Sequence, residues 1–203
     1  MMARREPDFF GDRELNLIYV ARKLKEALQL EKLLTDAGLD YLVEPDVFHD
    51  FFGHVPLLTI PAFARFMQAY GEAGPKALAV PGALNMLARL YWYMVEFGLI
   101  RTAAGLRVYG AGILSSRGES LYALESPKPP RIAFDLRRVM RTRYRIDAFQ
   151  SAYFVIDRFE DLLRETLETD FAPLYRALEG EADIAPGEII PEDRLVPSLE
   201  GQP

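Results

Sequence analysis

The chain has 203 residues, half of them hydrophobic, and is therefore long enough to bury the core of one globular domain. Its 24 basic and 30 acidic residues give a formal net charge of −6, which argues against a general nucleic-acid-binding surface. The sequence contains no cysteine, which excludes disulfides, thiolate zinc sites and iron–sulfur clusters. A bound metal would have to be held by nitrogen and oxygen.

The N-terminal part predicts a small strand–helix–strand unit. Residues 15–21 have strand composition, apolar residues recur at helical spacing within residues 24–37, and residues 40–43 fit a second strand. We expect residues 1–43 to form this βαβ segment. The first residues lack the apolar stretch of a secretory signal, and no uncharged apolar run reaches the length of a membrane span. We therefore expect a cytoplasmic protein without a membrane partner.

From residue 44 onward, aromatic-rich segments broken by proline and glycine predict a different architecture. Helices are expected within residues 63–70, 84–99 and 158–168, and strands within residues 144–146 and 152–156. Together these elements indicate an α+β fold whose mostly helical core, residues 44–178, contains short strands. The remaining residues, 179–203, are acidic and rich in proline, and we expect them to be extended or disordered.

The chain's only two histidines, His49 and His54, lie five residues apart among acidic and aromatic residues. Neutral imidazoles suit Fe, Zn, Cu or Ni, so the pair indicates a metal site. On an ideal α-helix two such side chains point roughly 140° apart. Convergence on one ion therefore requires the helix to distort or to end near Gly53. The alternative is a pair of histidines whose hydrogen bonds are satisfied without a metal.

Glu96 is the candidate oxygen ligand. It lies near the end of residues 84–98, whose apolar side chains cover most of the circumference of a helix and so indicate burial. A carboxylate in that position needs a cation to offset its desolvation. The cation is either a metal ion or a salt-bridge partner, for which Arg89 and Arg101 are the candidates.

Other polar and aromatic residues could complete such a site. Asp50 flanks His49 and can orient an imidazole N–H. Ser115 and Ser116 follow a Gly-Ala-Gly turn, where their hydroxyls can reach a ligand or simply satisfy the turn. Trp92 precedes Glu96 by four residues and could wall the same cavity.

Three segments carry a specific resemblance to a known family. They are Glu44–Leu58 (EPDVFHDFFGHVPLL), Tyr91–Leu99 (YWYMVEFGL) and Tyr109–Ser116 (YGAGILSS). With these motifs, and with further likeness as far as about residue 175, the core resembles the pterin-dependent aromatic amino acid hydroxylases, nearest to the bacterial phenylalanine 4-monooxygenases. The resemblance implies that His49, His54 and Glu96 are the catalytic ligands of a non-haem Fe(II). It further implies hydroxylation of phenylalanine to tyrosine with tetrahydrobiopterin and O2.

The same resemblance assigns further site residues. Pro45 and Trp92 fall where the family lines its amino-acid pocket, and Ser115 falls where a hydroxyl supports an iron-bound histidine. Ser116 lies with Glu119 in the neighbouring wall. We therefore expect Pro45, Trp92, Ser115 and Ser116 at the substrate.

Two residues fit the pterin cofactor, and the front of the chain departs from the family pattern. Asp50 and Tyr91 match family positions near the pterin. Upstream of Tyr41 the family has a longer segment, which includes an arginine that binds the substrate carboxylate. In this sequence Leu34 occupies the position of that arginine. The expected fold is thus a hydroxylase core truncated at its N-terminal side. The βαβ segment before it weakly resembles a small signal-transducing family.

Two other functions fit the same residues. One is a metal-binding or interaction protein derived from the hydroxylase family with impaired catalysis. The other is a zinc hydrolase, because imidazole and carboxylate also suit zinc, although the surroundings offer no evident general base. Phenylalanine, tryptophan and tyrosine are not distinguished as substrates, and the oligomeric state is not predicted.

Overall fold

The computed structural model describes residues 49–197; the expected βαβ segment, residues 1–43, lies outside them, as does Pro45. Within the described part, a four-stranded sheet has the order β2-β1-β4-β3. Strand β1 is antiparallel to β2, whereas β4 is parallel to both of its neighbours, β1 and β3. The strands are β1 (Leu99–Thr102), β2 (Gly105–Val108), β3 (Arg131–Ala133) and β4 (Tyr153–Ile156).

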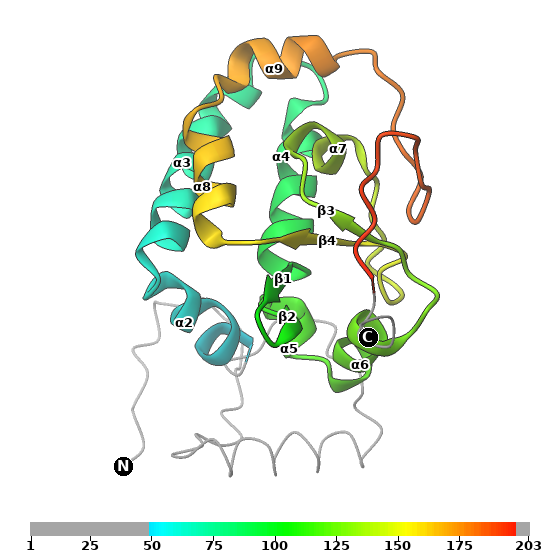
Figure 1. Ribbon diagram of the computed structural model, residues 1–203. Coiled ribbons are helices and arrows are strands. Elements are labelled where there is room, and N and C mark those ends of the chain that lie inside the picture. The colour runs from blue at the N-terminus through cyan, green and yellow to red at the C-terminus, as the bar shows by residue number, and fades with distance from the viewer. Residues whose placement is uncertain (1–48, 198–203) are drawn as a thin grey trace, which may run out of the picture. The chain divides into compact units, whose positions relative to one another are not determined.

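Helices surround this sheet (Figure 1). The helix α3 (Pro61–Ala77) packs along α8 (Phe159–Leu167) and contacts α9 (Phe171–Leu178), while α4 (Ala83–Tyr91) packs against α7 (Leu136–Arg141). Two π-helices adjoin them, η2 (His49–His54) before α2 and η3 (Trp92–Glu96) after α4. The other helices within residues 49–197 are α2 (Val55–Leu58), α5 (Ala111–Leu114) and α6 (Arg117–Glu125). The expected α+β fold is confirmed.

All four residues of β4 are buried, because neighbouring strands flank it and helices pack on the sheet. The expected strand within residues 152–156 is therefore confirmed, as is the expected helix that α8 forms. The strand expected at residues 144–146 is wrong. Side chains satisfy the carbonyls there, since Tyr93 donates to Arg143 at 2.7 Å and Gln150 donates to Arg145 at 2.9 Å. These residues form a loop.

The described part of the C-terminal tail is extended but not disordered. It follows the edge of β3, where the amide of Ala133 donates to Arg194 and the amide of Val196 donates to Arg131, both at 2.8 Å. Beneath the tail, Arg138 and Asp193 form an ion pair at 2.8 Å whose side chains are only 5% and 2% exposed. This buried pair helps to anchor a segment whose composition alone suggested an extended or disordered tail.

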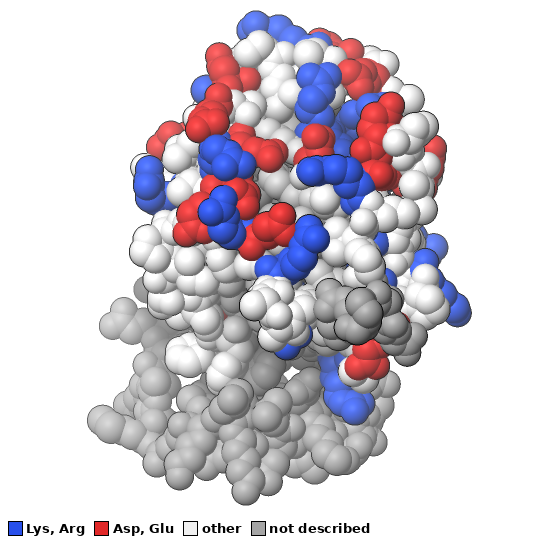
Figure 2. All heavy atoms as spheres, viewed as in Figure 1, with Lys and Arg blue, Asp and Glu red and all other residues white. Residues whose placement is uncertain are grey.

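On the face shown in Figure 2, Lys and Arg side chains lie beside Asp and Glu over much of the described surface. Such mixing agrees with ion pairs at the start of α8, where Asp161 lies 3.0 Å from Arg158, which precedes the helix, and 3.2 Å from Arg164. Among the described helices, none is both long and apolar enough to cross a bilayer.

Tyr109 gives a prediction about stability. Its hydroxyl is buried and has no hydrogen-bond partner among the described residues, while its ring packs edge-on against Phe63 and Phe159. A buried polar group without a partner destabilises a fold. We expect Tyr109→Phe to raise the free energy of unfolding by about 1 kcal/mol in urea denaturation.

The matched control is Tyr93→Phe, because the buried Tyr93 hydroxyl donates to the carbonyl of Arg143 at 2.7 Å. Its loss should lower the free energy of unfolding by about 1 kcal/mol. Equal effects of the two changes would show that the hydroxyl of Tyr109 has a partner after all.

Candidate metal centre

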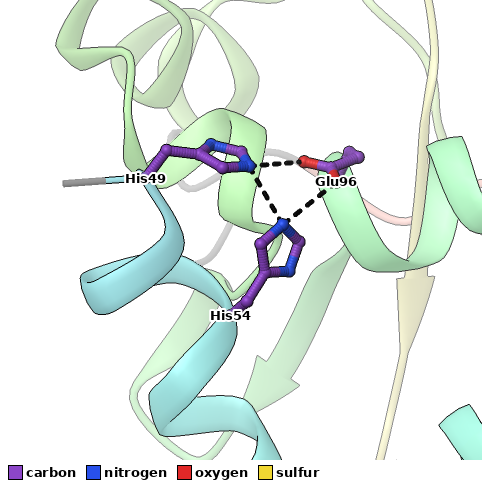
Figure 3. Close-up of side chains that lie close together, drawn as sticks. All are labelled: His49, His54 and Glu96. Carbon is purple, nitrogen blue, oxygen red and sulfur yellow. Dashed lines mark hydrogen bonds and ion pairs between the residues drawn. The ribbon is translucent and has the colours of Figure 1, made fainter. Parts of the chain in front are cut away.

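Three side chains from two separate segments meet at one point (Figure 3). The Nε2 atoms of His49 and His54 lie 3.0 Å apart. A carboxylate oxygen of Glu96 lies 3.5 Å from the first of these nitrogens, and its other oxygen lies 3.3 Å from the second. One ligand atom from each residue falls within 4.8 Å of the others. This spacing allows all three to coordinate one ion.

The convergence depends on helix geometry. His49 and His54 are the first and last residues of η2, and Glu96 is the last residue of η3. Hydrogen bonds in a π-helix join residues five apart, so the two histidines lie on the same side of the helix instead of pointing roughly 140° apart as on an α-helix. The expected distortion is confirmed, and π-helical turns are frequent at functional sites.

Gly53 has a steric role in this arrangement. A Cβ atom added there would lie 2.6 Å from the Cβ of Ala111, closer than packed carbon atoms allow. Its absence lets η2 approach α5, and that approach brings His49 within reach of Ser115. The sequence had indicated Gly53 only as a point where the helix could change direction.

The environment of Glu96 favours a cation other than arginine. Its side chain is 13% exposed. Arg89 binds Asp183 at 2.6 Å and Arg101 binds Asp157 at 2.7 Å, so both expected salt-bridge partners are engaged elsewhere. The hydrogen bond that Glu96 accepts from His54 raises the pKa of His54, although burial acts in the opposite direction. The carboxylate thus favours positive charge at the point where the three residues meet.

Ser115 fixes the orientation of His49. The Ser115 hydroxyl donates its single proton to the carbonyl of Ala111 at 2.9 Å, so toward His49 it must accept. The partner is Nδ1 of His49 at 3.0 Å, which therefore carries the proton. Nε2 is left with its lone pair directed at His54 and Glu96. This is the tautomer that a metal ligand needs.

Loss of that hydroxyl should weaken metal binding. We expect Ser115→Ala to lower Fe(II) affinity by about 10- to 100-fold, the range typical for a residue that orients a ligand. Anaerobic titration of the metal-free chain would measure it. Ser120→Ala is the matched control, because its hydroxyl also donates to a backbone carbonyl, that of Ile113 at 2.9 Å. Equal affinity in both variants would contradict the orienting role.

The other residues expected at the site lie in distinct settings. Trp92 stacks on Tyr144 with ring centres 4.5 Å apart, and its indole N–H donates to Gln150 at 3.1 Å. Ser116 caps α6 by accepting the amide proton of Glu119 at 3.2 Å. Ser115 contacts the candidate ligand His49, as described above. The substrate-binding roles of these serines and of Trp92 stay predictions.

The two expected pterin residues lie beside the candidate ligands. Asp50 is exposed on η2, next to His49 in the chain. The ring of Tyr91 lies 6.5 Å from the ring of His54. Burial, with help from the charge of Glu96, raises the pKa of Tyr91 to about 12, so its hydroxyl keeps its proton at neutral pH. Their roles at a pterin stay predictions.

Sequence reasoning missed Gln150. It is 2% exposed, and its backbone amide donates to the carboxylate of Glu119 at 2.8 Å. Glutamine in a loop carries no pattern that marks it in a sequence. Its partner Glu119 was noticed only through the family resemblance.

Comparison with known proteins agrees with this geometry. Residues 36–178 match the family described as biopterin-dependent aromatic amino acid hydroxylase. The phenylalanine-4-hydroxylase of Ralstonia nicotianae is 62% identical over 158 residues, which cover 78% of this chain and 50% of that protein. The enzyme of Rattus norvegicus is 39% identical over 67% of this chain and 29% of its own length.

Solved structures show the same relationship. The Chromobacterium violaceum phenylalanine hydroxylase with bound oxidised Fe(III) is 60% identical, with a TM-score of 0.75 over 78% of this chain and 57% of that one. The same enzyme bound to cobalt gives the same TM-score and identity, over 78% of this chain and 56% of that one. The chain spans about half the length of the curated bacterial relatives that it matches at about 60% identity.

Proposed function

The chain belongs to the family of biopterin-dependent aromatic amino acid hydroxylases, and we propose that it hydroxylates phenylalanine to tyrosine with Fe(II), tetrahydrobiopterin and O2. The observation that carries the proposal is the convergence of His49, His54 and Glu96. Two histidines and one carboxylate are the donor set of non-haem Fe(II) oxygenases, which keep coordination positions open for reactants. The Fe(III) and cobalt structures of a relative support iron as the metal.

Each of the three side chains would have a defined part. His49 and His54 would bind through Nε2, and Ser115 holds the first of them in the required tautomer. Glu96 would contribute one negative charge, so that two neutral imidazoles and one carboxylate leave Fe(II) with a net charge of 2 − 1 = +1. When bound, iron and the pterin would supply the electrons that activate O2.

The remaining assignments concern substrate and pterin. Trp92 would contact the aromatic ring of the amino acid, with Pro45, Ser115 and Ser116 in the same pocket. Asp50 and Tyr91 would bind the pterin, and their positions beside His49 and His54 support this assignment. The proton that Tyr91 retains would let it donate a hydrogen bond.

The test uses the full chain loaded anaerobically with Fe(II). Tetrahydrobiopterin, L-phenylalanine and ¹⁸O2 are then added, and tyrosine carrying one ¹⁸O atom is expected by mass spectrometry. Parallel reactions with tryptophan or tyrosine would identify the preferred substrate. Full iron loading without any hydroxylated product would contradict the proposed activity.

A second candidate is metal binding without turnover. This alternative is supported by the length of the chain, which covers only 50% of the Ralstonia nicotianae phenylalanine-4-hydroxylase. Under this alternative, chelation would lower the melting temperature of the iron-loaded chain, while no hydroxylated product would form. Detection of labelled tyrosine would rule it out.

A further inference from the structure

One loop, residues 144–150, contacts Trp92 both on its ring face and at its indole N–H. The ring of Tyr144 stacks on its face, with centroids 4.5 Å apart and planes 16° apart, and Gln150 accepts its indole N–H at 3.1 Å. The amide of Gln150 also closes the loop, because its Nε2 donates to the carbonyl of Arg145 at 2.9 Å. A carbonyl can only accept, so the amide orientation is fixed and Oε1 must face Trp92.

Glu119 holds Gln150 in turn. Its Oε1 atom accepts the backbone amide of Gln150 at 2.8 Å and the hydroxyl of Tyr153 at 2.9 Å. The sequence from Ser116 to Glu119 has the spacing of a capping box, in which the glutamate would bond back to the start of the helix. Here the carboxylate points inward instead and is 2% exposed. Burial of a carboxylate is unfavourable unless hydrogen bonds compensate for the lost hydration. The two bonds that Glu119 accepts therefore constrain the structure.

The segment that carries Glu119 also contacts a candidate metal ligand. Ser115, which orients His49, directly precedes the residue that caps α6, and Glu119 lies in the first turn of that helix. Trp92 and Glu96 are the two ends of η3. Residues 115–119 therefore contact two parts of the site. Ser115 bonds the candidate ligand His49, and Glu119 bonds Gln150, which in turn bonds Trp92 at the start of η3.

We propose that Gln150, held by Glu119, is a positioning residue that sets the plane of Trp92 against the aromatic ring of the substrate. The inference rests on the proposed function, in which Trp92 lines the amino-acid pocket. Gln150 does not touch the substrate in this account. It acts by holding the indole at a fixed angle, so its loss affects recognition of the amino acid and leaves metal binding intact.

The central variant is Gln150→Met, which keeps the length of the side chain and removes both amide hydrogen bonds. Trp92 is the single tryptophan of the chain, so near-ultraviolet circular dichroism reports on its ring alone at the long-wavelength edge. We expect that band to weaken and the Kd for L-phenylalanine, measured anaerobically by equilibrium dialysis, to rise about five-fold. Iron content should stay at one per chain.

A second variant serves as the matched control. Thr166→Val removes a buried hydroxyl that bonds within α8, at 3.0 Å to Leu162, and controls for a general loss of stability. In turnover, Gln150→Met should raise the KM for phenylalanine while the KM for the pterin stays unchanged.

The outcomes separate this inference from the proposed function. If the unmodified chain binds phenylalanine and Gln150→Met binds it equally well, Gln150 has no positioning role. The same conclusion follows if Thr166→Val weakens binding as much as Gln150→Met does. An unmodified chain that binds iron but no aromatic amino acid would overturn the proposed substrate, and this inference with it.

Discussion

Exchange of Glu96 for alanine is expected to lower the Fe(II) affinity of the full chain by more than about 100-fold, beyond the effect of losing a residue that only orients a ligand. The carboxylate is the negative group among the three candidate ligands, with its oxygens 3.5 Å and 3.3 Å from the Nε2 atoms of His49 and His54. Without it, two imidazoles 3.0 Å apart remain, and neither brings charge to offset that of the metal. Iron content after gel filtration, measured by mass spectrometry, would show the loss.

Glu165→Ala is the matched control. Glu165 is also a partly buried glutamate, and burial raises its pKa, but it lies on α8 and not among the candidate ligands. We expect that variant to retain one iron per chain. Full iron content in Glu96→Ala would show that the metal binds elsewhere.

The second large effect is expected for Gly110→Ala. A Cβ atom at this position would lie 2.4 Å from the carbonyl oxygen of Glu96 and 2.6 Å from the amide nitrogen of Gly98. Both are backbone atoms, so the clash is relieved only by a backbone shift, either at residue 110 or at the end of η3 and the residues that follow it. We expect a loss of about 3 kcal/mol or more in the free energy of unfolding, together with weakened iron binding.

Gly71→Ala provides the comparison, because nothing lies within 4 Å of a Cβ added there and the residue is inside α3. That change should stabilise the protein by about 0.5–1 kcal/mol, since alanine is the better helix former. Similar urea midpoints for the two variants would mean that the contact at Gly110 does not constrain the site.

The sequence was most informative about the candidate ligands. His49 and His54 are the only histidines, and a carboxylate on an apolar helix needs a cation, so chemistry alone selected the three residues. Whether Glu96 met a metal or an arginine could not be decided from residue type. The structure decides against Arg89 and Arg101, because each already binds another carboxylate.

The sequence was least informative where long-range contacts determine local structure. Composition suggested an extended or disordered tail after residue 178, but hydrogen bonds to β3 and a buried ion pair between Arg138 and Asp193, 55 positions apart, anchor the described part of that tail. The strand expected around Tyr144 is a loop because Gln150 and Tyr93 satisfy its carbonyls. Pairings of this kind depend on the tertiary structure and leave no periodic pattern.

The π-helical geometry is an intermediate case. The spacing of the histidines required a departure from α-helix, and Gly53 indicated where it would occur. The departure spans all of η2 instead of ending the helix, and a second π-turn in η3 carries Glu96. That second turn had no signal in the sequence, since its residues continue the apolar pattern of α4.

The most direct test of the metal centre is a crystal of the full chain soaked in Co²⁺ or Fe(II), with an anomalous difference map recorded at the absorption edge of the metal. Our account predicts one strong peak bonded to Nε2 of His49, Nε2 of His54 and a carboxylate oxygen of Glu96. A peak bound by other residues, or none at all while the three side chains keep their present positions, would contradict it.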